Sequence, residues 1–134
     1  MNNNLSATLS NSKQYTLAVA AAMPEKDYPG KPCDEIFSFG ELLNHIAYGI
    51  EWWEANYVKG IKMDWAPPVV SNNKADVISY LEKAYDSLAK TISAVSGDGA
   101  TAGFYATLDH ITHHRGQATI YLRTKGITPP EYMY

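Results

Sequence analysis

Three of the four histidines of this chain lie within five residues, in the segment LDHITHHRGQATIYLR. In a helix, His110 and His114 lie about 40° apart around the axis, because each residue turns the chain by about 100°. Two imidazoles at this i and i+4 spacing can each give one nitrogen to the same metal ion. His113 falls on the other side of His110, away from the apolar stripe of the helix. The spacing therefore predicts one pair of ligands, which alone would hold a metal weakly.

The remaining histidine, His45, lies in the segment ELLNHIAYG, on the flank of the apolar stripe of another expected helix. It can supply a third nitrogen, and three protein ligands leave a coordination position open for water or substrate. A second interpretation stays open at this point. Histidines beside an apolar stripe can also be hydrogen-bonded core residues or surface residues without a ligand.

The helix that carries His114 offers further candidates for contacts with a substrate. Gln117 and Tyr121 follow His114 on the same face, so each can hydrogen-bond an imidazole, a bound water or a substrate. A buried tyrosine also needs a hydroxyl partner in a purely structural role. Arg115 can bind an anionic group, such as the carboxylate of a small thiol, or it can form a surface ion pair. Gly116 is expected to permit a close contact between helices.

The helix that carries His45 ends in two adjacent tryptophans, in the segment EWWEANY. Trp52 and Asn56 share the flank of His45, so they are candidates for one wall of a pocket. Trp53 falls on the apolar stripe, which continues to Tyr57, and is expected to pack in the core.

Two kinds of metal enzyme are disfavoured by the residues around the histidines. Zinc peptidases of the H-E-x-x-H type need a glutamate after the first histidine, and Ile111 stands there. Di-iron bundles need a glutamate three residues before a histidine ligand, and no candidate ligand here has one.

The histidines must be positioned by helices, because apolar residues recur at spacings of three and four. The clearest helix begins after Ser38, whose side chain can cap Glu41 while Phe37 packs on Leu42. It ends before Gly60. The other predicted helices span about 12–23, 74–95 and 102–125.

These four helices predict an all-α, four-helix bundle that forms one domain over residues 1–134. No alternating run of apolar residues predicts a strand. The connections after the first and second helices are long enough to cross the bundle from end to end, so an up-down-up-down order is not required.

The composition narrows the classes of partner. At 134 residues and 46% apolar, the chain can bury a core as one domain. A net charge of −3 with scattered basic residues predicts no nucleic-acid partner, and no apolar run is long enough to span a membrane. The one cysteine, Cys33, forms no disulfide within the chain, which favours a reducing compartment and a cytoplasmic location.

The segments SFGELLNHIA, HITHHRGQATIYLR and GITPP together resemble the DinB-like metalloprotein superfamily, which includes the YfiT-type enzymes. The segment YTLAVAAAMPEKDY is similar to the first helix of that family and the loop after it. The most specific element of the resemblance is H-x-x-x-H-R-G-Q with an upstream histidine in a helix. The chain departs from a typical member in having few residues before Tyr15, which predicts a brief first helix.

The resemblance implies an up-down-down-up bundle with a long crossover connection, and a homodimer. It also implies that His45, His110 and His114 bind a divalent ion, which among members is zinc, nickel, manganese or iron. Members of known activity include transferases and maleylpyruvate isomerases that use low-molecular-weight thiols. The expected function is therefore metal-dependent transfer with a small thiol and a small-molecule substrate. A metal-dependent hydrolase and a non-catalytic metal- or ligand-binding stress protein are the alternatives.

Overall fold

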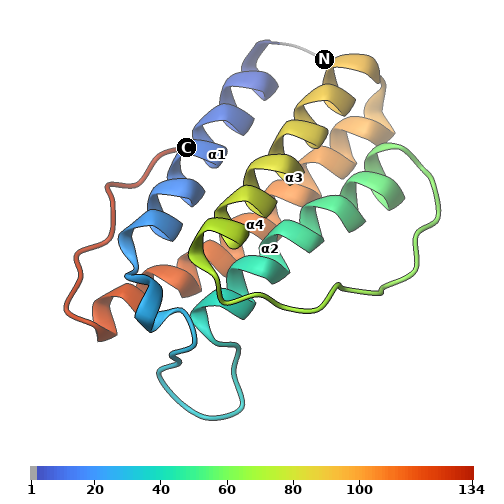
Figure 1. The fold of residues 1–134 in the computed structure, drawn as a ribbon. Coiled ribbons are helices and arrows are strands. Elements are labelled where there is room, and N and C mark those ends of the chain that lie inside the picture. Colours follow the sequence, from blue (N-terminus) through green and yellow to red (C-terminus); the bar gives the residue numbers. More distant parts are fainter. Residues whose placement is uncertain (1–2) are drawn as a thin grey trace.

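The computed structural model describes residues 3–134, and this part of the chain contains four α-helices and no strand (Figure 1). The helices are α1 (Asn3–Ala22), α2 (Phe39–Trp53), α3 (Lys74–Ala94) and α4 (Asp98–Thr124). A 3-10 turn, η1 (Glu25–Asp27), follows α1, and a π-helical turn, η2 (Glu54–Val58), continues α2. The predicted all-α class is confirmed.

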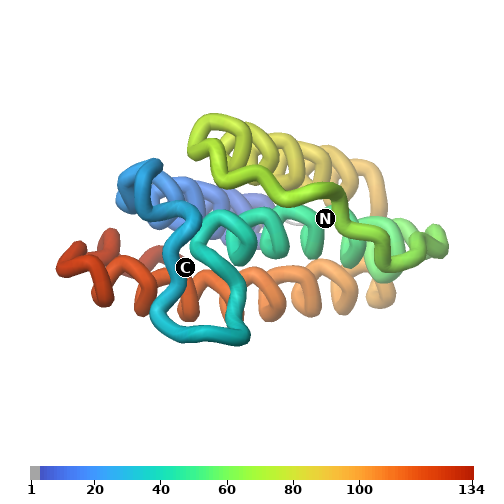
Figure 2. The backbone as a smooth tube through the Cα atoms, turned by 60° about the horizontal axis from the view of Figure 1, so that its bottom comes forward, coloured from blue at the N-terminus to red at the C-terminus, as the bar shows by residue number. Residues whose placement is uncertain are grey.

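The four helices lie alongside one another in a bundle, in which α1 and α4 run one way and α2 and α3 run the other way (Figure 1). The segment 59–73 connects the two parallel helices. It runs back along the outside of α2 over the length of the bundle, so that α3 starts at the end where α2 starts (Figure 2). The predicted up-down-down-up order with a long crossover is therefore confirmed.

Local signals fix the starts of α2 and α3. The Ser38 hydroxyl accepts a hydrogen bond from the Glu41 backbone N–H at 3.1 Å, as the capping motif predicts. Asn73 caps α3 in the same way, since its side-chain oxygen accepts from the Asp76 N–H at 3.0 Å. Between α3 and α4 the chain turns sharply at Gly97, whose φ of 105° is one that a residue with a Cβ rarely adopts.

The predicted starts of α1 and α4 were wrong. The first helix begins nine residues earlier than residue 12, so it is not brief. Leu5 and Leu9 are both buried in the core, and they extend the contact face of α1 although their neighbours are polar. The last helix begins at Asp98, four residues earlier than predicted. The packing of Leu5 and Leu9 therefore lengthens α1 beyond what local propensity indicates.

The π-helical turn at the end of α2 changes which side chains face the core. Its carbonyls accept from N–H groups five and six residues later, as in Glu54 O with Lys59 N at 2.8 Å. A wider turn shifts the following residues around the axis. Tyr57 is consequently 50% exposed, and its predicted place on the apolar stripe was wrong.

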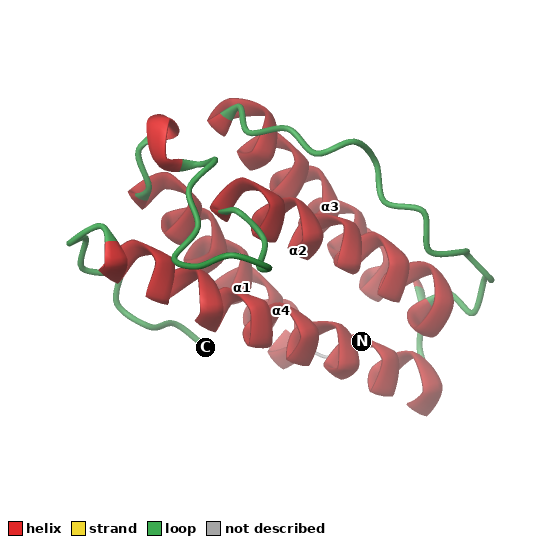
Figure 3. Cartoon of the chain, turned by 90° about the horizontal axis from the view of Figure 1, so that it is seen from below, coloured by secondary structure: helices red, strands yellow, loops and turns green. Residues whose placement is uncertain are grey.

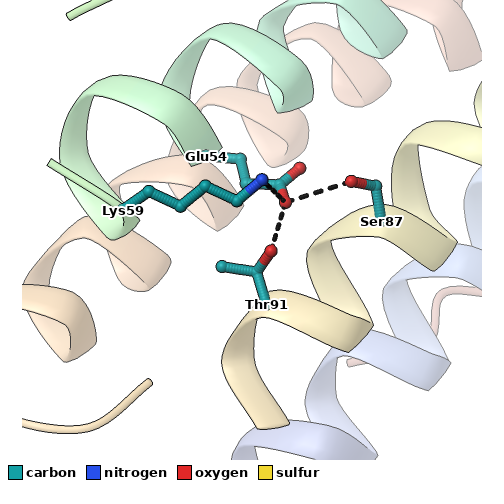
Figure 4. Close-up of polar contacts among 4 residues, drawn as sticks. All are labelled: Glu54, Lys59, Ser87 and Thr91. Atoms are coloured by element: carbon teal, nitrogen blue, oxygen red, sulfur yellow. Dashed lines mark hydrogen bonds and ion pairs between the residues drawn. The ribbon is translucent and has the colours of Figure 1, made fainter. Parts of the chain in front are cut away.

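Glu54 opens this turn and fastens it to α3 (Figure 4). Its buried carboxylate accepts hydrogen bonds from the hydroxyls of Ser87, at 3.1 Å, and Thr91. Lys59 adds an ion pair at 3.2 Å. A buried carboxylate with this many partners is satisfied, and we assign it to holding α2 against α3.

The core fills the space between the helices and is mostly aliphatic. Its largest fully buried side chains are Met23, Tyr28, Phe39, Leu42, Leu43, Ile46, Ile50, Leu81, Tyr85, Leu88, Ile92 and Phe104. No helix within residues 3–134 combines the length and the hydropathy needed to cross a membrane.

Candidate metal centre

The three predicted ligands meet between α2 and α4, which lie side by side in the bundle (Figure 3). His45 comes from α2, and His110 and His114 come from consecutive turns of α4. One ring nitrogen of each lies within 4.8 Å of the others. The Nε2 atoms of His45 and His114 are 3.0 Å apart. This arrangement can give three nitrogen ligands to one ion, from one face of the site.

The environment of the three imidazoles favours their neutral form, which is the form that binds a metal. Burial, and secondarily the nearby histidines, lowers the pKa of His110 to about 4. Burial and the neighbouring His114 lower the pKa of His45 to about 4 as well. The pKa of His114 is also lowered, chiefly by burial. At neutral pH the cluster therefore presents lone pairs rather than charges.

The ring of His110 occupies space that only a glycine on α2 leaves open. A Cβ atom at Gly49 would lie 2.4 Å from Cε1 and 2.7 Å from Nδ1 of His110. That Nδ1 atom is buried and has no hydrogen-bond partner among the described residues. A buried polar atom without a partner needs an explanation, and a bound ion or water is one. The residues present therefore fit a divalent cation that accepts imidazole ligands, such as zinc, nickel or iron.

Gln117 orients one of the ligands. Its side-chain oxygen lies 2.9 Å from Nδ1 of His114, so it accepts the proton that this nitrogen carries. The lone pair of His114 is then on Nε2, the atom that faces His45. The predicted hydrogen bond between Gln117 and an imidazole is thus present.

The chain is similar in structure to two known DinB-like proteins. No family model and no curated protein matches the sequence. A DinB-like protein from Bacillus cereus ATCC 10987 matches the structure with a TM-score of 0.80, at 14% sequence identity over 96% of this chain and 95% of that one. The DinB-like protein YjoA from Bacillus subtilis matches with a TM-score of 0.78, at 17% identity over 98% and 99% of the two chains. The chain has the DinB-like fold.

Aromatic side chains surround the histidines of this DinB-like bundle. The rings of Phe37 and Trp65 lie 5.2 Å and 5.6 Å from that of His45, and Trp53 lies 6.0 Å from His110. The prediction that Trp53 packs in the core was wrong, because it is only half-buried and faces the site. Trp65 was missed, since it lies in the crossover, where no periodicity relates it to the histidines. Its only sequence signal is a large aromatic residue in a loop.

Trp52 and Asn56 contact the crossover. The Trp52 ring packs 5.6 Å from that of Trp65. The Asn56 amide donates to the carbonyl oxygens of Trp52 and Met63 and accepts from the Met63 N–H at 3.1 Å. The prediction of Asn56 as a pocket residue is therefore not supported, because its polar atoms hold the crossover against the end of α2.

Arg115 faces away from the histidines, towards α1. It is only 3% exposed, and its guanidinium donates to the Ser12 hydroxyl at 3.2 Å and lies 4.6 Å above the Tyr15 ring. Neither predicted position, in the substrate pocket or in a surface ion pair, is correct. One residue after His114, the helix has turned by about 100°, which points Arg115 towards α1.

A cavity of about 500 Å³ adjoins the site at His114. Its wall is mainly apolar and includes Ile36, Phe37, Leu42 and Ile120, together with Gln117 and Tyr121. The Tyr121 hydroxyl donates to the Phe37 carbonyl oxygen at 2.6 Å, and burial raises its pKa. Tyr121 therefore lines the predicted pocket with its ring, while its hydroxyl fixes the segment before α2.

Proposed function

We propose that the protein is a divalent-metal-dependent enzyme that joins a low-molecular-weight thiol to a small electrophile. The observation that carries the proposal is the convergence of three neutral imidazole nitrogens within 4.8 Å beside a cavity. A divalent cation held there would supply the positive charge that lowers the pKa of a small thiol and favours its nucleophilic thiolate. The resemblance to thiol-dependent DinB-like enzymes supports the same chemistry.

The protein's own residues would bind and orient the reactants. His45, His110 and His114 would bind the ion, and Gln117 would keep the His114 lone pair directed at it. Neutral ligands leave the full double charge of the cation available to an anion. The aromatic rings of Phe37 and Trp65 cover His45 and would reduce access of water to the reacting atoms.

A metal-dependent hydrolase is less well supported. Such an enzyme needs a group that accepts a proton from the attacking water. The side chain bonded to His114 is the Gln117 amide, which has no basic site for this role. A thiol gives up its proton far more readily than water, so it needs no dedicated base.

The test begins with the metal content of untagged protein, measured by mass spectrometry. We expect about one equivalent per chain in the wild type and almost none in His45→Ala or His114→Ala. His113→Ala is the matched control, because His113 is an exposed neighbour that is not part of the triad. Wild-type protein that stays metal-free when zinc, nickel and manganese are offered would refute the proposal.

Catalysis is tested separately, by thiol consumption with chlorodinitrobenzene as the electrophile. An enzyme should consume the thiol in a manner that depends on both the metal and His45. Metal uptake without turnover, for a range of small thiols and electrophiles, would instead identify a non-catalytic metal-binding protein.

A further inference from the structure

The cavity beside His114 has a lining that restricts what it can hold. We propose that it binds a small, uncharged and largely apolar organic molecule, with one end against His114. As the site of a reactant this inference rests on the proposed function, whereas the binding itself does not. Three features of the cavity support this assignment: its apolar wall, the distribution of charge around it and its position beside the histidines.

Apolar side chains form most of the cavity wall. Ile36, Phe37, Leu42 and Ile120 contribute aliphatic and aromatic surface, and Ile36, Phe37 and Ile120 are exposed to solvent. Covering such surface is favourable in proportion to the apolar area removed from water. The volume of about 500 Å³ falls within the range of pockets that hold small organic ligands. The wall therefore favours an apolar occupant of that size.

The charges argue against an anion. No lysine or arginine belongs to the lining, and the one charged side chain there is the exposed carboxylate of Glu35. Arg115, the arginine nearest in sequence to the histidines, is buried against α1 and cannot reach the cavity. In metal-free protein, an anion moved from water into this lining would lose hydration and gain no opposite charge. Uncharged molecules avoid that penalty.

Two side chains link the cavity to the histidines. His114 lines it directly, and Phe37 lines it while its ring also lies 5.2 Å from that of His45. The Gln117 side chain is also in the lining, so a polar end of the occupant would meet an amide there. The bound molecule would thus present one end to the metal centre and its apolar body to the outer wall.

Two fluorescent probes that differ by a single charge test the proposal. N-phenyl-1-naphthylamine is uncharged, and 8-anilinonaphthalene-1-sulfonate has the same aromatic frame with an added sulfonate. We expect one site per chain for the uncharged probe and binding at least about tenfold weaker for the sulfonate. Equal or tighter binding of the sulfonate would overturn the proposal.

A pair of variants locates the probe. Ile120→Lys adds a cation to the cavity, so we expect about tenfold weaker binding of the uncharged probe and tighter binding of the sulfonate. Ile61→Lys is the matched control, because Ile61 is an exposed isoleucine in the crossover and is not in the lining. If Ile120→Lys changes neither affinity, the probe binds elsewhere and the proposal fails.

Cys33 provides an independent readout, since it is the only cysteine of the chain and lies in the cavity lining. Saturating uncharged probe should slow its alkylation by N-ethylmaleimide severalfold, and an unchanged rate would contradict binding in the cavity. The measurement should be repeated over a range of protein concentrations. Loss of the probe as dimers form would show that a second copy of the chain covers the cavity, and would overturn the proposal.

All probe measurements use metal-free protein. The test of the cavity is therefore independent of the test of the metal-dependent function. If the metal binds but the uncharged probe does not, only the assignment of the cavity is wrong. If the probe binds but no metal does, the cavity assignment stands and the metal-dependent function is refuted.

Discussion

His114 and Arg115 are neighbours in the chain, yet they belong to two different polar regions, one between α4 and α2 and the other between α4 and α1. On one side, His114 lies among neutral imidazoles, and His110 there has a buried nitrogen without a partner. On the other side, Arg115 lies in a buried network with Ser12, Thr16 and Tyr85. The Tyr85 hydroxyl lies 3.0 Å and 2.8 Å from the two α1 hydroxyls.

The two regions differ in whether their buried polar groups have hydrogen-bond partners within the protein. In the Arg115 region the buried hydroxyls and the guanidinium are hydrogen-bonded to one another, and the cation lies over aromatic rings. In the histidine region the imidazoles lie close together in their neutral form, and the buried Nδ1 atom of His110 has no hydrogen-bond partner among the described residues. A buried nitrogen without a partner therefore distinguishes the histidine side of α4 from the Arg115 side, where the buried hydroxyls and the guanidinium bond to one another.

The largest expected effect that tests this comparison is on stability. Arg115→Ala should lower the free energy of unfolding by about 3 kcal/mol, because it leaves a cavity between α1 and α4 and removes one of the partners of Ser12. Denaturant unfolding of metal-free protein measures this change. His114→Ala should cost much less, because its ring is half-buried beside a cavity.

The metal content of the Arg115→Ala variant tests whether the Arg115 region and the metal centre are independent of each other. The folded Arg115→Ala protein should still take up one ion per chain, and Arg115→Met, which restores most of the volume, should recover part of the lost stability. If the folded variant lost the metal, the two sides of α4 would not be independent.

An intermediate effect is expected at a pair of helical glycines. Gly49→Ala should weaken metal binding by about 10- to 100-fold, because its Cβ would push the His110 ring out of place. Competition with a chelator of known affinity measures the change.

Gly116→Ala is the matched control for Gly49→Ala. A Cβ at Gly116 would meet no atom within 4 Å, so the predicted close helix contact there was wrong. The substitution should leave metal affinity unchanged and stabilise the helix by about 0.5–1 kcal/mol. Equal effects at the two glycines would show that His110 does not need the space at Gly49.

A further expected effect is the pH dependence of stability in metal-free protein. The folded-state pKa values of His45 and His110 lie near 4, below the ordinary value of 6.5. Between these limits the unfolded chain binds more protons, so stability should be full above about pH 6.5 and fall as the pH drops towards 4. Melting temperatures across this range test the sign. The double variant His45→Gln, His110→Gln should show a flatter profile, and an unchanged profile would assign the dependence to other groups.

Much of the site was predictable because its signals are local. The i and i+4 spacing of His110 and His114 needs only a helix, and that helix also places Gln117 beside His114. The start of α2 was predictable for the same reason, because Ser38 caps a turn three residues away. The place of His45 opposite the pair followed from the apolar stripe and from the family resemblance.

The errors have a common cause in contacts between segments far apart in the chain. Trp65 reaches His45 only because the crossover returns along α2. Trp53 was assigned to the core by its spacing, but α4 brings His110 against it. Arg115 is buried because α1 packs hydroxyl groups and an aromatic ring against its guanidinium.

By itself, the sequence determined the helical class, the capped start of α2 and the three histidines, because these depend on periodicity and on hydrogen bonds within a few residues. Only the tertiary structure decided the length of α1, the room that Gly49 leaves for His110 and the separation of Arg115 from the cavity. These features depend on which surfaces pack together, and packing is a property of the whole bundle rather than of any one segment.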